Sequence, residues 1–319
     1  MSRGLGDVYK RQVSNNITPY EGDASFLQGP TERTKAVWNH CLKALEEERN
    51  NNGIRALDYT TVSTITSHPA GYIDKENELI VGLQTDQVLK RAIKPFGGIN
   101  VVMKACRENG VEVDDRVKDI FTHYRKTHND GVFDVYTEEI RSFRSLGFLT
   151  GLPDNYARGR IIGDYRRLAL YGLDRLIEAK KEDLHNLTGP MTEARIRLRE
   201  EVAEQIKALK EIKVLGEYYG LDLSRPAYTA QEAVQWVYMA YLAAVKEQDG
   251  AAMSLGNVSS FLDIYLEYEL SQGTITETFA QELIDQFVIK LRMVRHLRMQ
   301  SYNDIFAVSY THLTLPTKA

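Results

Sequence analysis

The chain has 319 residues, 43% of them hydrophobic, which is enough for one large domain or two small ones with a substantial core. Its formal net charge of −4 argues against a general nucleic-acid partner or an anionic membrane surface. No stretch approaches the roughly 20 apolar residues of a membrane span, and the first residues lack the apolar core of a secretory signal. We therefore expect a cytoplasmic protein.

Helices and short strands alternate along the first half of the chain. Thr31 is predicted to cap a helix that runs through the mid-forties and stops at the sequence Asn-Asn-Gly of 51–53. Residues 62–66 and 79–83 are apolar and rich in β-branched side chains, so they are predicted as short strands.

A second amphipathic helix is predicted before position 127. Its apolar stripe consists of Val117, Ile120, Phe121 and Tyr124. Residues 132–136 are then predicted as a strand, and Thr137 is predicted to cap the helix that follows it.

The second half of the chain is mostly helical. A long charged helix is predicted from about Thr192 to Tyr219, and Thr229 opens a capping box for a helix that is apolar nearly all round and should be buried. Residues 251–255 are predicted as a strand. The last strong helix is predicted from the stripe Leu283, Ile284, Phe287, Val288 and Leu291. Short strands between longer helices favour an α/β architecture.

Four arginines fall within ten positions of the segment 151–167 (GLPDNYARGRIIGDYRR), interleaved with glycines that let a ligand approach the main chain. A helix beginning near Ile161 would add the positive potential of its N-terminus. The planar fork of an arginine suits a carboxylate or a phosphate. The pattern indicates an anion site, although Arg160 and Asp164, four apart on a helix, would also form an ordinary surface ion pair.

The same segment, continued to Gly172, resembles the pyruvate formate-lyase (formate C-acetyltransferase) family of glycyl-radical enzymes nearly position for position. Six further blocks resemble that family in the same order. These blocks are 18–23, 63–73, 80–85, 94–99, 124–137 and 250–254. The resemblance runs from about Thr18 to Ala307, and the family's chains are far longer, so the chain resembles their N-terminal part.

Both ends depart from this resemblance. Residues 1–12 (MSRGLGDVYKRQ) and 308–319 (VSYTHLTLPTKA) match nothing in the family and are similar to translated sequencing-adapter tails. We expect them to be non-native tails that do not pack, which leaves 13–307 as the family-like domain.

The resemblance implies both a fold and a reaction. The fold is the N-terminal half of a ten-stranded α/β barrel, in which two parallel five-stranded halves meet antiparallel. The reaction is the cleavage of pyruvate by coenzyme A to formate and acetyl-coenzyme A, in fermentative pyruvate metabolism. A protein glycyl radical that passes to one of two adjacent cysteines supplies the chemistry, and the family implies a homodimer and a radical-SAM activating enzyme as partners.

Two residues carry the substrate site that the resemblance implies. Arg160, the second arginine of the Arg-Gly-Arg run, corresponds to the residue that binds the pyruvate carboxylate, and Ala251 to a backbone position lining the pyruvate pocket. Arg158 matches the other arginine of the run and is expected only to support the local structure. Ala157 stands where many relatives have glycine, which restricts the local backbone but leaves both arginines in place.

No catalytic or metal-binding residue is assigned to this chain. Its two cysteines, Cys41 and Cys106, are far apart and are predicted to be buried structural thiols, so the family's adjacent cysteine pair is not carried over. His68 and His128 have no metal-ligand spacing and are predicted to be structural. The element 96–98 (Phe-Gly-Gly) lacks the ending of a phosphate loop and is predicted to be a turn.

Three functions remain open at this stage. The first is formate C-acetyltransferase, present as a fragment that is inactive alone because it has neither the cysteine pair nor the radical glycine. The second is another glycyl-radical enzyme, a 2-ketoacid formate-lyase, a diol dehydratase or a C–N lyase, although a neutral diol has no carboxylate to pair with Arg160. The third is a structural module without activity.

Overall fold

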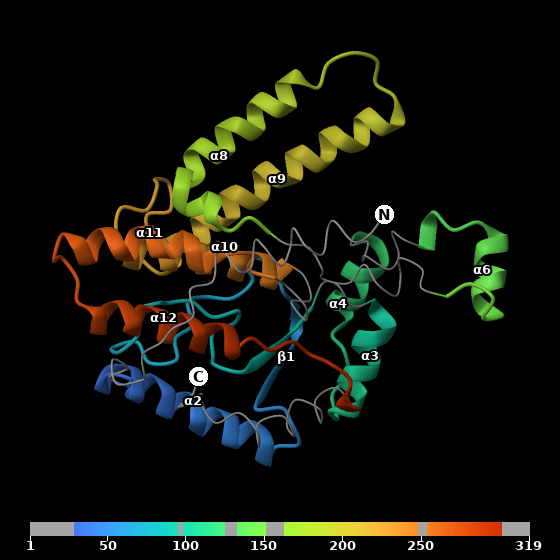
Figure 1. Cartoon of the computed structure of the whole chain (residues 1–319). Coiled ribbons are helices and arrows are strands. Elements are labelled where there is room, and N and C mark those ends of the chain that lie inside the picture. The colour runs from blue at the N-terminus through green and yellow to red at the C-terminus, as the bar shows by residue number, and fades with distance from the viewer. Residues whose placement is uncertain (1–28, 95–97, 125–132, 151–162, 248–253, 302–319) are drawn as a thin grey trace, which may run out of the picture.

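Helices dominate the chain, and the computed structural model arranges them around two short strands (Figure 1). The structure describes residues 29–94, 98–124, 133–150, 163–247 and 254–301. The elements in chain order are α2 (Glu32–Asn50), β1 (Ala56–Val62), β2 (Lys90–Ile93), α3 (Ile99–Glu108), α4 (Asp115–Asp119), the π-helical turn η2 (Ile120–Tyr124), α6 (Glu138–Ser145), α8 (Arg166–Asn186), α9 (Glu193–Tyr218), α10 (Ala230–Glu247), α11 (Val258–Ser271) and α12 (Glu277–Arg292).

The two strands pair in parallel, with Ala56 opposite Lys90 and Val62 opposite Ile93. The strand expected at 62–66 is wrong except for its first residue, because the chain turns after β1. The Ser67 amide donates to the Thr64 carbonyl at 3.3 Å, which closes that turn. The β2 strand (KRAI) was not predicted, since its first two residues are basic and the segment lacks the run of apolar, β-branched residues that is typical of a buried strand.

The strand expected at 79–83 is also wrong, because side chains take the place of a neighbouring strand. Gln235 of α10 accepts from the Val81 amide at 2.7 Å and donates to the Val81 carbonyl at 2.9 Å. Gln286 of α12 accepts from the Leu79 amide at 2.6 Å, and the Tyr238 hydroxyl donates to the Gly82 carbonyl at 3.0 Å. The buried backbone is thus satisfied without a ladder.

The remaining two strand predictions fall partly outside the described ranges. Of the expected strand 132–136, residues 133–134 are helical and 135 lies in a turn, so that prediction is wrong where it can be compared. Of the expected strand 251–255, only 254 and 255 are described, and 254 makes a single bridge.

Most of the predicted helix ends are confirmed. A capping side chain bonds to an amide only three residues away, so the local sequence is enough to predict it. Thr31 and Thr192 accept from the amides of Thr34 and Arg195, and α2 ends at Asn50. The Thr229 hydroxyl likewise accepts from the Glu232 amide at 3.1 Å at the start of α10.

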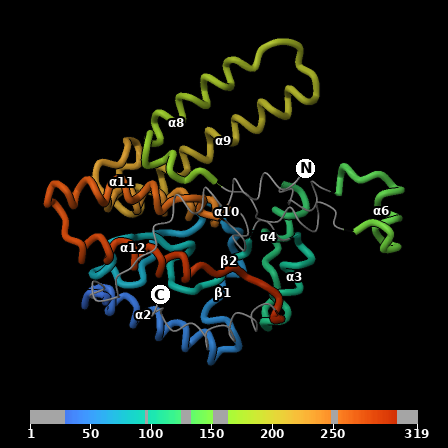
Figure 2. Tube along the Cα trace, viewed as in Figure 1, coloured from blue at the N-terminus to red at the C-terminus, as the bar shows by residue number. Residues whose placement is uncertain are grey.

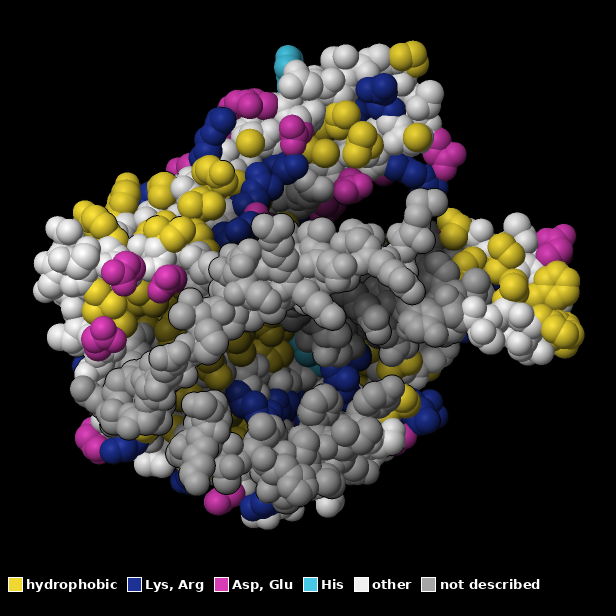
Figure 3. Space-filling view, in the orientation of Figure 1, with side chains coloured by type: hydrophobic (Ala, Val, Ile, Leu, Met, Phe, Trp, Pro, Cys, Tyr) yellow, Lys and Arg dark blue, Asp and Glu magenta, His cyan; other side chains and the backbone are white. Residues whose placement is uncertain are grey.

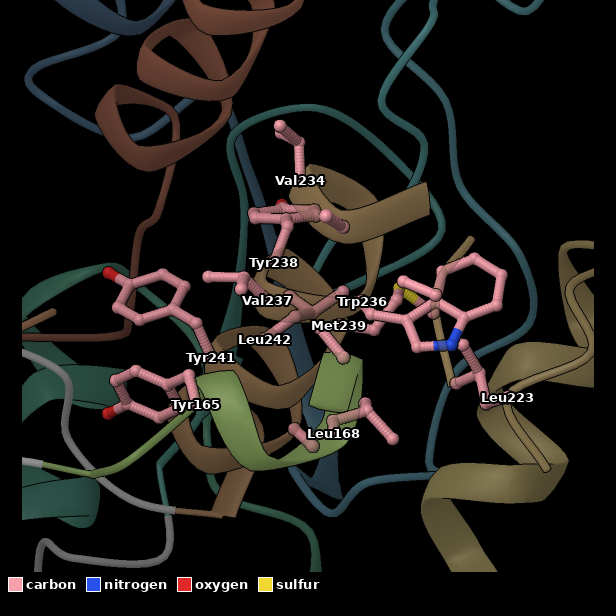
Figure 4. Close-up of a cluster of buried hydrophobic side chains, with 14 of the residues drawn as sticks. Tyr165, Leu168, Leu223, Val234, Trp236, Val237, Tyr238, Met239, Tyr241 and Leu242 are labelled. Atoms are coloured by element: carbon pink, nitrogen blue, oxygen red, sulfur yellow. The ribbon is translucent and has the colours of Figure 1, made fainter. Parts of the chain in front are cut away.

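The helix α10 lies at the centre of the largest hydrophobic core, as its composition predicted. Thirteen of its 18 residues are buried, and it packs against α8, α9, α11 and α12. Figure 4 shows side chains from several of its faces, together with Leu168 of α8 and Leu223. A helix enclosed in this way fixes the position of the segment that follows it.

The antiparallel helices α8 and α9 form a hairpin that projects from the rest of the molecule (Figure 2). Its base is held by a break in α8 at Gly172, which has φ +70°. The break frees the amides of Leu173 and Asp174 to donate to the carbonyls of Leu223 and Ser224, at 2.8 and 3.1 Å.

A buried cluster of charges joins both ends of the described chain. The Glu48 carboxylate of α2 accepts from Arg91 of β2 at 2.9 Å and from Arg295, just after α12, at 3.3 Å. All three residues are at most 5% exposed. Because both guanidiniums contact the same carboxylate, the cluster ties three elements together without an isolated buried ion.

The helix predicted from Val117 to Tyr124 is present but widens into the π-helical turn η2 at Ile120. Val117 and Phe121 are buried as predicted, whereas the Tyr124 side chain is 79% exposed. The wider turn rotates the end of the helix out of register with the apolar stripe, so Tyr124 leaves the core.

Candidate functional site

The two predicted substrate-binding residues, Arg160 and Ala251, lie outside the described residues, in the segments 151–162 and 248–253. The described residues on either side of these segments show what the neighbouring elements contact. The segment with Arg160 leads into α8, and the segment with Ala251 continues from α10.

The start of α8 differs from the expectation of a helix beginning near Ile161. Gly163 and Asp164 are not helical, and α8 begins at Arg166. The Asp164 carboxylate accepts two hydrogen bonds from the Arg166 guanidinium, at 2.7 and 3.1 Å. This contact holds the pKa of the Asp164 carboxyl below its usual value, so Asp164 has a close arginine partner other than Arg160.

Tyr165 and Tyr241 connect the two helices next to these segments. Their rings meet edge to face with centroids 5.8 Å apart (Figure 4), and both residues are at most 7% exposed. Burial raises the pKa of Tyr241 to about 12 and also raises that of Tyr165. Sequence reasoning did not select this pair, because only the packing of α8 on α10 brings the two tyrosines together.

The C-terminal end of α10 is anchored to the segment that follows β1. The Ser63 hydroxyl donates to the Lys246 carbonyl at 2.8 Å, and the Ile65 amide donates to the Glu247 carboxylate at 3.1 Å. The Ser63 amide in turn donates to the Ile93 carbonyl at the end of β2, at 2.8 Å. The end of α10 therefore meets the carboxyl ends of both strands.

Three of the four side chains that were predicted to be structural can be compared with the fold. His68 is 4% exposed, with one ring nitrogen 2.7 Å from the Ser67 hydroxyl and the other 3.1 Å from the Asp58 carboxylate. These contacts contribute to a pKa of Asp58 well below its usual value, and a buried ring with a partner at each nitrogen is what a structural histidine requires. His128 lies outside the described residues.

Cys41 and Cys106 are free and fully buried, as predicted. Burial raises the pKa of the Cys41 thiol to about 12, so neither its position nor its protonation suits a nucleophile. The turn predicted at 96–98 is described only at Gly98, which precedes α3.

Within the described ranges, no group of three His, Cys, Asp or Glu side chains is placed to hold a metal ion. None of the described helices is both long enough and apolar enough to cross a membrane.

The fold is that of the glycyl-radical enzymes. The structure is similar to the B12-independent glycerol dehydratase from Clostridium butyricum, with a TM-score of 0.60 and 18% identity over 88% of this chain and 42% of that chain. It is also similar to a structure of 1,2-propanediol dehydration in Roseburia inulinivorans, with a TM-score of 0.57 and 18% identity over 86% of this chain and 41% of that chain. These similarities confirm the helix-rich, partial α/β barrel that was predicted.

The chain belongs to the pyruvate formate lyase-like family, whose sequence profile matches residues 7–316. It is 55% identical over 300 residues to the formate acetyltransferase of Haemophilus influenzae. That match covers 92% of this chain and 39% of the relative, so the chain spans about two fifths of the relative's length. The predicted family is confirmed.

Proposed function

We propose that the chain is the N-terminal part of a formate C-acetyltransferase, which converts pyruvate and coenzyme A to formate and acetyl-coenzyme A. The observation that carries this proposal is the 55% identity to the Haemophilus influenzae formate acetyltransferase over 92% of the chain. The fold, shared with solved glycyl-radical enzymes, agrees with this assignment.

In this function Arg160 binds the substrate carboxylate and the Ala251 backbone lines the same pocket. A bidentate guanidinium holds a carboxylate in a fixed orientation without adding a competing proton donor. The convergence of the neighbouring elements supports a common site: Tyr165, five residues after Arg160, packs on Tyr241, ten residues before Ala251. Arg158 has a supporting role.

The radical chemistry is supplied by parts of the family's longer chains that this polypeptide does not contain. Cys41 and Cys106, its two cysteines, are 65 positions apart, so there is no adjacent pair to carry a thiyl. The whole enzyme requires a protein glycyl radical, coenzyme A, a radical-SAM activating enzyme and a second subunit. Its place is the cytoplasm, in fermentative pyruvate metabolism.

The competing functions are less well supported. The two structural relatives named for glycerol and 1,2-propanediol are 18% identical to the chain, which establishes a common fold and no common substrate. A 2-ketoacid formate-lyase with a larger substrate would also use Arg160, because its substrate carries the same carboxylate. A structural module without activity does not account for the arginine-rich, glycine-containing sequence of 151–167.

Binding of pyruvate to this chain tests the proposed site. Isothermal titration with pyruvate is expected to give weak binding that Arg160→Ala removes and Arg160→Lys retains in part, because lysine keeps the charge but loses the bidentate fork. Arg158→Ala is the matched control and is expected to change the affinity by less than about threefold.

Two outcomes would contradict the proposal. If glycerol or 1,2-propanediol bound in an Arg160-independent way and pyruvate did not bind, the dehydratase alternative would be favoured. If Arg158→Ala and Arg160→Ala lowered the affinity equally while both variants kept the wild-type melting temperature, Arg160 would not be the specific carboxylate ligand.

A further inference from the structure

Gln84, in the segment between β1 and β2, is a buried amide with one end unpaired. It is 7% exposed, and its Oε1 accepts from the Arg295 amide at 2.8 Å. Because a backbone N–H can only donate, this contact fixes which end of the Gln84 side chain is the oxygen. The other end, Nε2, has no hydrogen-bond partner within the described chain. A buried donor without a partner costs free energy, so this nitrogen requires an acceptor.

A small internal cavity lies beside this amide. Its volume is about 10 Å³, and Gln84, Tyr238 of α10 and Lys290 of α12 are part of its wall. Other parts of the wall are apolar and include Leu89 and Met293. A water molecule needs roughly 10–15 Å³ of such space. The cavity therefore has room for one water molecule and for nothing larger.

Two polar groups of the wall meet at a single backbone oxygen. The Tyr238 hydroxyl donates to the Gly82 carbonyl at 3.0 Å, and the Lys290 ammonium donates to the same carbonyl at 3.2 Å. The ammonium also lies 2.9 Å from the Glu78 carboxylate. These contacts occupy two of its three protons, and the phenol oxygen keeps its lone pairs. One donor and one acceptor are thus left close to Gly82, two residues before Gln84.

Bulk solvent hardly reaches these groups. Figure 3 shows hydrophobic and charged side chains on the outer surface, as on α6 at the right of the view, whereas Tyr238 and Lys290 are each only 1% exposed. An acceptor for the Gln84 amide must therefore be a molecule enclosed in the cavity.

We propose that the cavity between Gln84, Tyr238 and Lys290 is a binding site for one water molecule. The water oxygen accepts from Gln84 Nε2 and from the Lys290 ammonium, and one water proton is donated to the Tyr238 oxygen. Three hydrogen bonds are typical of a buried water. The three partners belong to the segment between the strands, to α10 and to α12, so the water joins these parts of the core. Its binding does not depend on the proposed function.

A high-resolution crystal structure of the whole chain tests this site directly. We expect a water oxygen at about 2.7–3.2 Å from Gln84 Nε2, Lys290 Nζ and Tyr238 Oη. Gln235 is the internal control: it is 3% exposed, but its Nε2 donates to the Val81 carbonyl at 2.9 Å, so no water is expected beside it. A cavity without water density, or a Gln84 Nε2 bonded to a protein oxygen, would overturn the assignment.

Val294→Ile provides a test in solution. Val294 is part of the cavity wall, and an added methylene that enters the cavity displaces the water. The donors of Gln84 and Lys290 then lose their acceptor, so the melting temperature is expected to fall by about 3 °C or more. Val88→Ile is the matched control, because Val88 is also partly buried but does not line this cavity. Its melting temperature is expected to change by less than about 2 °C.

The direction of the change separates a hydrated cavity from a dry one. In a dry cavity the added methylene would fill a void and make new apolar contacts, which raises the melting temperature. A rise in Val294→Ile would therefore overturn the water site. If Val294→Ile does not fold, the density between Gln84, Tyr238 and Lys290 in the wild-type crystal structure decides the question.

Discussion

At the scale of single residues, Gly172 shows how one backbone position holds the base of the α8–α9 hairpin. It has φ +70°, and a Cβ added there would lie 2.4 Å from the Arg225 carbonyl carbon and 2.5 Å from the Ser224 oxygen. Only glycine combines this conformation with so close an approach.

Gly172→Ala is therefore expected to lower the free energy of unfolding by about 2–5 kcal/mol, from backbone strain and overpacking together. Gly220→Ala is the matched control, because Gly220 has φ +71° with nothing within 4 Å of the added Cβ, and its loss should be about 1 kcal/mol. Chemical denaturation of both variants gives the comparison. Equal losses would show that the contact with Ser224 and Arg225 is unimportant.

The buried lysine Lys246 of α10, 1% exposed, predicts a dependence of stability on pH. Its pKa is about 8 in the folded chain and 10.5 in the ordinary reference state, so the unfolded chain binds the extra proton between these values and the folded state gains stability as the pH rises. The free energy of unfolding of the wild type, measured against Lys246→Met, should therefore increase from pH 8 to pH 10.5. A difference independent of pH would contradict the burial of this ammonium.

At the scale of elements, the buried segment 79–83 depends on side chains of α10 and α12 instead of a strand partner. Gln235→Leu removes both hydrogen bonds to Val81 and is expected to destabilise the protein by about 2–4 kcal/mol, since two backbone groups lose their partners. Gln281→Leu is the control, because Gln281 is exposed and its side chain donates to Asp285 on the same helix. Urea denaturation should leave this control within about 0.5 kcal/mol of the wild type.

The same elements show what could be predicted from the sequence. The ends of α2 and α9 were predictable because Thr31 and Thr192 cap them through contacts three residues away. The strand at 79–83 was mispredicted because its apolar pattern is that of a strand, while its partners, Gln235 and Gln286, lie more than 150 residues further along the chain.

The candidate site was only partly predictable, and for the same physical reason. Arg160 and Ala251 were selected through the family resemblance, and both stay predictions. Tyr165 and Tyr241 meet only in the folded chain.

At the scale of the whole molecule, the proposed carboxylate site of this polypeptide lacks the adjacent cysteine pair that the reaction requires. We expect no formate from pyruvate and coenzyme A when the chain is incubated anaerobically with an activating enzyme and S-adenosylmethionine, because positioning alone gives no turnover. Chromatographic detection of formate above the level of a protein-free control would contradict this prediction. The positive control is an intact formate acetyltransferase under the same conditions.

The central claim is that this chain forms the pyruvate-binding part of a formate C-acetyltransferase, and a chimera tests it most directly. The chain would replace the matching segment of the Haemophilus influenzae relative, to which it is 55% identical, and formate release from pyruvate would be measured after anaerobic activation. We expect turnover in the chimera and its loss in the same chimera with Arg160→Ala. A folded chimera that carries the glycyl radical but releases no formate, or one that is unaffected by Arg160→Ala, would contradict the account.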